Sequence, residues 1–154
     1  MIARRLTPAL QRSAKSLLLL GPRQTGKSTL VAQLEPDLTI NLFHEPTYLE
    51  FARNPHELEE RLAALPAGAQ RRSIFIDEVQ RLPSLLNTVQ ALLDRPRCPY
   101  RFLLTGSSAE PFTKSHTRRL VQHPKFRASH RIGRSTEPRS TSSSRQSARS
   151  GPSS

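Results

Sequence analysis

A short glycine-bounded stretch contains the residue types whose spacing points most directly to chemistry. It reads Gly21-Pro22-Arg23-Gln24-Thr25-Gly26-Lys27-Ser28 and follows a run of four leucines at residues 17–20. A glycine, four further residues and then Gly-Lys-Ser form the pattern of a phosphate-binding loop. The backbone N–H groups of such a loop point inward at the phosphates, and the helix that follows presents the positive end of its dipole.

Two side chains at the end of this loop have predicted roles toward a nucleoside triphosphate. Lys27 would place a positive charge at the β- and γ-phosphates, and Ser28 would offer its hydroxyl to Mg²⁺. A glycine turn rarely combines all four fixed positions by chance. We therefore expect a site for ATP and Mg²⁺, with nucleotide contacts from Gly21, Pro22, Arg23, Gln24, Thr25, Gly26, Lys27, Ser28 and Thr29.

A pair of acids follows another apolar run, in Ser73-Ile74-Phe75-Ile76-Asp77-Glu78. Asp77 at the end of a strand would hold the metal, and Glu78 would orient or deprotonate the attacking water. Strands often end in acidic turn residues, so the pair alone is a weak signal. It gains weight because it comes 50 residues after Lys27, in the order that a phosphate-loop enzyme requires.

Apolar runs and periodic segments alternate along the chain and predict the elements that position these residues. Short apolar or alternating runs predict strands at residues 17–20, 38–42, 74–76 and 102–104. Helical periodicity predicts helices at residues 28–35, 54–65 and from about residue 83, the second one with Asn54 as N-cap. Alternating strands and helices predict an α/β fold, a parallel sheet with flanking helices.

Three blocks of this sequence, at residues 17–30, 74–83 and 101–109, resemble the prokaryotic AAA+-type P-loop ATPases whose core precedes a C-terminal domain of uncharacterised function. The resemblance covers roughly residues 1–109. It implies a Walker A loop with Lys27 and Ser28, a Walker B pair of Asp77 and Glu78, and a sensor-1 polar group after the fourth strand. Thr105, Ser107 and Ser108 compete for that last role, and we favour Ser107 or Ser108. The implied catalytic set is Lys27, Glu78, Ser107 and Ser108, with Ser28 and Asp77 at the metal.

Beyond residue 109 the sequence departs from this family. We recognise no fifth strand, arginine finger, sensor-2 arginine or helical lid there. Residues 110–154 contain 10 of the 24 Lys and Arg residues but only two of the 12 Asp and Glu residues, and they are rich in serine. We predict a partial core at 1–109 and a disordered basic tail at 110–154, produced by truncation or a frameshift. Impaired hydrolysis and an exposed edge at residues 17–20 are the expected consequences.

Two other function classes stay open from the sequence. A nucleotide-binding fragment without turnover would keep the loop but not the chemistry. A nucleic-acid-binding protein would use the basic tail, which offers only Phe112 and Phe126 as aromatics for stacking on bases. A GTPase is disfavoured because no asparagine is followed by the lysine of a guanine-reading segment. A small-molecule kinase is disfavoured because such enzymes usually lack a glutamate placed like Glu78.

The remaining signals concern metals and location. His116, His123 and His130 recur every seven residues but have no cysteine partners, so we expect no metal site there. Cys98 is the only cysteine, which excludes a disulfide within the chain and fits a reducing compartment. The leucine run is far too short for a membrane span. We expect a cytoplasmic location, and no protein partner can be identified.

Overall fold

A computed structural model describes residues 11, 13–22, 26–107 and 114–130. In chain order, its strands and helices are β1 (Ser16–Gly21), α2 (Lys27–Ala32), β2 (Leu38–Asn41), α3 (Glu45–Arg53), α4 (Glu57–Ala63), β3 (Arg72–Asp77), the 3₁₀ turn η1 (Val79–Arg81), α5 (Leu85–Asp94), β4 (Tyr100–Ser107), α6 (Lys114–Val121) and β5 (Phe126–His130). Within this part of the chain, no helix is long and apolar enough to cross a membrane.

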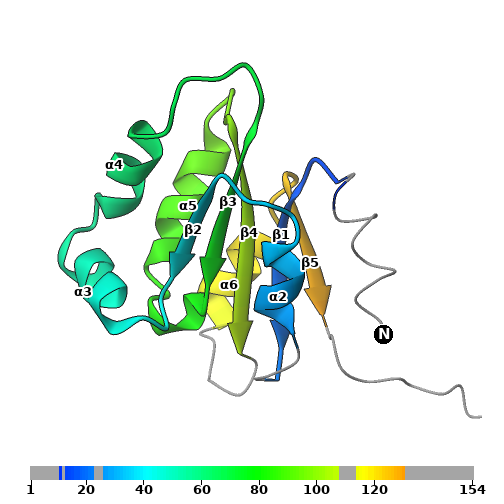
Figure 1. Cartoon of the computed structure of the whole chain (residues 1–154). Coiled ribbons are helices and arrows are strands. Elements are labelled where there is room, and N and C mark those ends of the chain that lie inside the picture. Colours follow the sequence, from blue (N-terminus) through cyan, green and yellow to red (C-terminus); the bar gives the residue numbers. More distant parts are fainter. Residues whose placement is uncertain (1–10, 12, 23–25, 108–113, 131–154) are drawn as a thin grey trace, which may run out of the picture.

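The strands form one sheet in the order β2-β3-β4-β1-β5, and every neighbouring pair is parallel (Figure 1). The register places Leu18 opposite Leu104, and Asn41 opposite Asp77. The predicted α/β class with a parallel sheet is confirmed. Because all strands run the same way, their carboxyl ends meet at one edge, where ligands bind in open α/β sheets.

Side chains alternate between the two faces of the sheet and build two separate apolar clusters. Leu17 and Leu19 of β1 pack with Leu30 and Val31 of α2 on one face. On the other face Leu18 belongs to a larger cluster with residues of α3, α4, α5 and α6. Figure 1 shows this division, with α2 on one side of the sheet and α5 and α6 on the other. The four leucines of the loop-bearing strand are therefore buried or nearly buried, which fixes the position of the strand.

The expectation that the chain lacks a fifth strand is wrong. Residues 126–130 form β5 and pair with residues 16–20 of β1, so β1 is an inner strand and not an edge. Leu120 of α6 is fully buried and Phe126 is 5% exposed. The expectation of an unstructured tail from residue 110 therefore fails over residues 114–130. A missing strand therefore no longer supports truncation.

The basic side chains of residues 114–130 give this segment the composition of a solvent-exposed tail. Two of its side chains instead make polar contacts within the fold. Lys125 Nζ donates to the carbonyls of Leu93 at 2.7 Å and Arg95 at 2.9 Å, at the end of α5. His123 Nε2 lies 2.8 Å from Asp94 Oδ1 on the same helix. A helix and strand this short need few apolar anchors when polar contacts complete their packing. The nucleic-acid-binding alternative involves the whole tail, residues 110–154, of which 110–113 and 131–154 lie outside the described residues.

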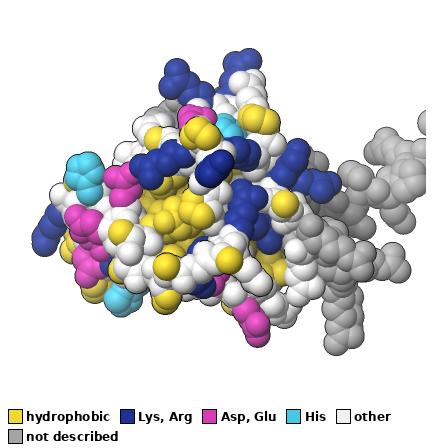
Figure 2. All heavy atoms as spheres, turned by 90° about the horizontal axis from the view of Figure 1, so that it is seen from above, with side chains coloured by type: hydrophobic (Ala, Val, Ile, Leu, Met, Phe, Trp, Pro, Cys, Tyr) yellow, Lys and Arg dark blue, Asp and Glu magenta, His cyan; other side chains and the backbone are white. Residues whose placement is uncertain are grey.

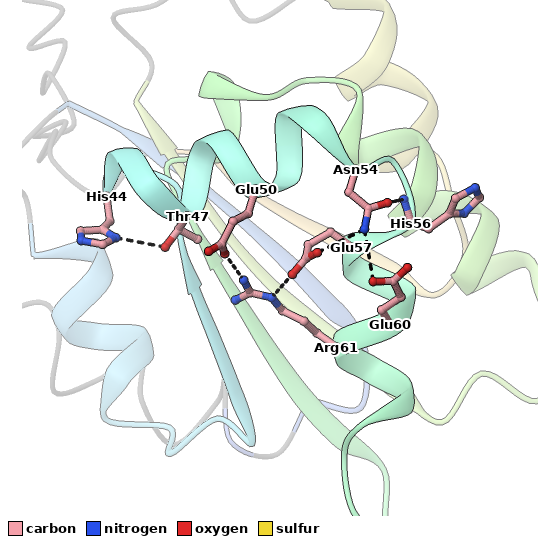
Figure 3. A network of polar contacts seen from close by, with 8 residues as sticks. All are labelled: His44, Thr47, Glu50, Asn54, His56, Glu57, Glu60 and Arg61. Carbon is pink, nitrogen blue, oxygen red and sulfur yellow. Dashed lines mark hydrogen bonds and ion pairs between the residues drawn. The ribbon is translucent and has the colours of Figure 1, made fainter.

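A network of polar contacts joins α3 to α4 (Figure 3). Asn54, the predicted N-cap, accepts from the His56 N–H at 3.0 Å, and α4 begins at Glu57, later than expected. Asn54 Nδ2 donates to Glu57 Oε2 at 3.3 Å. Arg61 Nε donates to Glu57 Oε1 at 2.7 Å, and the same guanidinium contacts Glu50 of α3. These contacts hold α3, which the sequence did not predict, against α4.

Positive charge gathers at the edge formed by the amino ends of the strands. Figure 2 shows Lys and Arg side chains around an apolar area on this face. Arg71 Nε donates to the Tyr100 carbonyl at 3.1 Å, and Arg101 Nε donates to the Lys15 carbonyl at 3.1 Å. This basic surface lies at the end of the sheet opposite the predicted nucleotide site.

Candidate functional site

The predicted phosphate-binding loop connects β1 to α2. Gly26 is the N-cap of α2 with a φ of +75°, in the left-handed region that favours glycine. A Cβ at this position would meet no atom within 4 Å, so the backbone conformation and not a lack of space calls for glycine. The Leu30 N–H donates to the Gly26 carbonyl at 2.9 Å and starts the helix. Three predicted nucleotide contacts, Arg23, Gln24 and Thr25, lie outside the described residues.

Lys27 points back into the loop and is 5% exposed. Its Nζ donates to the carbonyls of Gly21 at 2.8 Å and Pro22 at 2.6 Å. Burial lowers the pKa of Lys27 below its ordinary value, and the negative charges of Glu78 and Asp77 act in the opposite direction. The ammonium group is thus held at the loop, near both acids.

The Asp77 carboxylate joins three elements of the site. Ser28 Oγ of α2 donates to Asp77 Oδ2 at 2.7 Å, although the two residues are 49 positions apart. The Thr105 hydroxyl of β4 contacts the other carboxylate oxygen, which also accepts from the Glu78 N–H at 3.1 Å. A hydroxyl and a carboxylate are hard oxygen donors of the kind that Mg²⁺ prefers. The residues present therefore fit that ion.

Glu78 follows directly, at the turn out of β3. Its φ is +56°, a left-handed conformation that costs a non-glycine residue about 1 kcal/mol or more. Its carboxylate accepts from Gln80 Nε2, and Gln80 Oε1 accepts from the Ser107 N–H at 3.1 Å. The sequence reasoning gave Gln80 no role. In the sequence, the only feature that could have indicated this role is that Gln80 comes two residues after Glu78. Hydrophobic periodicity assigns no function to that position.

The structure brings together two glycines, the lysine, a serine and both acids that the sequence selected. Gly21, Gly26, Lys27, Ser28, Asp77 and Glu78 lie at the carboxyl ends of β1 and β3. Thr29 is exposed on α2. Among the three sensor-1 candidates, the Thr105 hydroxyl contacts Asp77, the Ser107 N–H is bound by Gln80, and Ser108 lies outside the described residues.

Other potential metal or thiol chemistry is not assembled in the part of the chain that the structure describes. There, no group of three or more His, Cys, Asp or Glu side chains is arranged to hold a metal ion. The side chains of His116 and His130 lie outside the described residues, whereas His123 contacts Asp94. Cys98 is half-buried and its Sγ lies 3.6 Å from the Tyr100 carbonyl. Cys98 is therefore part of the packing around β4.

A parallel sheet with this loop between β1 and α2, and an acid pair after β3, defines a P-loop nucleotide-binding core. Residues 13–126 match the sequence profile of the family described as "AAA domain". The chain belongs to that family. The match begins before β1 and extends through α6 to the first residue of β5.

The relatives of this chain include uncharacterised proteins of Mycobacterium bovis and Mycobacterium tuberculosis, each 40% identical over 112 residues. The alignments cover 70% of this chain and 23% of each relative, so the chain spans about a quarter of their length.

Similar solved structures include the P-loop NTPase domain of an Escherichia coli sigma-54 transport activator, at 16% identity, a TM-score of 0.48 and coverage of 84% of this chain and 92% of that one. Caenorhabditis elegans PCH-2 gives 18% identity, a TM-score of 0.46 and coverage of 84% and 40%. The family assignment rests on the sequence match.

Proposed function

We propose that this chain binds ATP with Mg²⁺ and hydrolyses it slowly. The observation that carries the proposal is the 2.7 Å contact between Ser28 Oγ and Asp77 Oδ2. It joins the end of the phosphate loop to the first acid of the pair and leaves Glu78 one residue further on. No requirement of packing alone would gather a buried lysine, a hydroxyl and two acids at the carboxyl edge of a parallel sheet.

Each side chain has a separate task in binding. Lys27 exchanges its two carbonyl acceptors for oxygens of the β- and γ-phosphates, since an ammonium forms stronger hydrogen bonds with charged acceptors. Ser28 and Asp77 would hold Mg²⁺, which neutralises charge on the phosphates when it is bound. Burial of Lys27 raises the cost of leaving its charge without an anionic partner, and this favours phosphate binding.

Glu78 is the proposed general base. Its carboxylate accepts the proton of the attacking water, and its place beside Asp77 sets it at the γ-phosphate end of the site. Its strained backbone supports this role, because left-handed conformations of residues other than glycine cluster at functional sites. Thr105 is the proposed sensor-1 group in preference to Ser107 or Ser108, because its hydroxyl contacts Asp77.

We expect slow hydrolysis because the sequence shows no recognisable arginine finger. An arginine finger stabilises charge that develops in the transition state and contributes about 10³- to 10⁵-fold in related P-loop enzymes. Arg81, close to Glu78 in sequence, is already engaged: its guanidinium donates to the Leu42 carbonyl at 2.7 Å and pairs with Glu45 at 2.8 Å. We therefore expect the chain by itself to bind nucleotide well and to turn it over poorly.

Calorimetry with Mg-ATP tests the binding step. Lys27→Ala should abolish the binding signal, because no other described group replaces its charge at the phosphates. Lys15→Ala is the matched control, since Lys15 is exposed at the opposite edge of the sheet, and it should bind Mg-ATP as the wild type does. Equal affinity of Lys27→Ala and Lys15→Ala would contradict the site assignment.

A further inference from the structure

Gln80 connects the catalytic acid to the end of the neighbouring strand. We propose that Gln80 is a positioning residue that holds the Glu78 carboxylate in place for catalysis, with its anchor on the backbone of β4. This inference rests on the proposed function, since it assigns Gln80 a part in the work of Glu78. It adds a residue that acts through another and touches neither nucleotide nor metal.

The direction of both hydrogen bonds follows from their chemistry. A backbone N–H can only donate, so the Ser107 N–H requires the oxygen of the Gln80 amide, which lies 3.1 Å away. The amide nitrogen is then turned toward Glu78, and it donates to Oε2 of that carboxylate. The orientation of the amide is thus fixed by a backbone group and not by a choice between two equivalent placements.

Burial makes this arrangement costly to lose. Gln80 is 8% exposed, among the few buried polar side chains of the described residues. A buried amide that loses a partner costs about 1–3 kcal/mol, so the side chain is strongly held in the orientation that satisfies both of its ends. Burying a glutamine, with its three side-chain torsions, loses more conformational entropy than burying a smaller apolar residue that would serve for packing alone. Its two bonds explain why it is present.

The contact leaves the carboxylate ready for its task. Gln80 donates to Oε2 of Glu78, and in this proposal Oε1 is the oxygen that accepts a proton from water. The anchor, Ser107, lies two residues after Thr105 on β4. The carboxyl end of β4 therefore positions both carboxylates, Asp77 directly through Thr105 and Glu78 through Gln80.

The test compares Gln80→Met with the wild type in two measurements. Methionine keeps the length and volume of the side chain but can make neither hydrogen bond. We expect the single-turnover rate of ATP hydrolysis at saturating Mg-ATP to fall about 10- to 100-fold, because a displaced base keeps part of the roughly 10²- to 10⁴-fold that a general base contributes. The dissociation constant of Mg-ATP should change by less than about threefold, because Gln80 contacts no nucleotide-binding group. Gln90→Met, on α5 and away from the site, is the matched control and should keep the wild-type rate.

A double variant separates positioning from general damage. In a Glu78→Gln chain, adding Gln80→Met should lower the residual rate no further, because the residue that Gln80 positions is already disabled. If Gln80→Met fails to fold, Gln80→Glu provides the test. The glutamate keeps the shape of the side chain and an oxygen that accepts from the Ser107 N–H, but it has no N–H group to donate to Glu78. It should lose rate to a similar extent.

The outcomes separate this inference from the proposed function. A wild-type rate in Gln80→Met, with the rate of Glu78→Gln strongly reduced, would overturn the role of Gln80 alone. So would a loss of nucleotide affinity equal to the loss of rate, or a further loss on the Glu78→Gln background, because either indicates a structural role. Equal rates in the wild type and Glu78→Gln would refute the proposed hydrolysis, and the role of Gln80 would fall with it.

Discussion

The burial of Leu120 gives a direct measure of how firmly α6 and β5 belong to the fold. Leu120 lies in α6 with no exposed surface, within the cluster that also contains Leu92 and Leu93 of α5. Replacing it by alanine removes three carbon atoms from a closed interior and leaves a cavity. The effect on the free energy of unfolding therefore reports the packing of a segment that the sequence represents as a polar tail.

The magnitude follows from the burial. Three methylene-sized groups at about 0.8 kcal/mol each give about 2.4 kcal/mol for the transfer of the lost atoms. A cavity that the neighbours do not fill adds up to about 2 kcal/mol, so we expect Leu120→Ala to destabilise the chain by about 2.5–4.5 kcal/mol. This is a large part of the 5–15 kcal/mol that stabilises an ordinary domain.

Urea unfolding of the full chain, followed by circular dichroism, measures the change. Arg119→Ala is the matched control: it sits one position earlier on the same helix, is exposed, and should change the free energy of unfolding by less than about 0.5 kcal/mol. A loss below about 1 kcal/mol for Leu120→Ala, close to the control, would mean that α6 does not pack on the sheet. The correction to the sequence-based prediction would then itself be wrong.

Two further predictions concern Lys27 and the edge of the sheet. Without nucleotide, Lys27→Met should match or exceed the wild-type free energy of unfolding at pH 7, because it removes a charge that burial disfavours. This stability advantage of Lys27→Met should shrink as pH rises from the lowered pKa of Lys27 toward 10.5, because in that window the unfolded wild-type chain binds a proton that the folded chain has released. Urea titrations at pH 7 and pH 10 measure the difference in free energy of unfolding. An advantage that grows with pH would contradict the prediction. A chain ending at residue 109 lacks β5 and leaves β1 as an apolar edge, so it should aggregate or melt without cooperativity, whereas the full chain should not. A monomeric, cooperatively melting fragment of residues 1–109 would refute this.

The sequence predicted the part of the fold where pattern and chemistry agree. The inner stripe of α5, which includes Val89 and Leu92, is buried, because an apolar period of 3.6 has few alternatives to a helix on a sheet. Lys27, Ser28 and Asp77 could be placed in one site, because the carboxyl ends of parallel strands share an edge.

The elements that the sequence missed carry few apolar residues. The only buried residue of α3 is Phe51, so its apolar periodicity is weak, and its contacts with α4 include the polar pair of Glu50 and Arg61. In α6 and β5, Leu120 and Phe126 are buried while Lys125 is held by the carbonyls of α5, a contact that composition cannot predict. Gln80 was missed for a related reason, since its role depends on a backbone group of β4, 27 residues away.

Phosphate release from Mg-ATP under single-turnover conditions, in the wild type and in Glu78→Gln, tests the central claim most directly. Both chains should bind Mg-ATP with similar affinity, because an amide keeps the size of the carboxyl group and Lys27, Ser28 and Asp77 are unchanged. The wild type should release phosphate slowly, below about 1 s⁻¹, the lower end of typical enzyme turnover. Glu78→Gln should release phosphate at least about 100-fold more slowly and keep only a small residual rate, since an amide cannot accept the proton. Equal release by the two chains would contradict the assignment of Glu78 as the base.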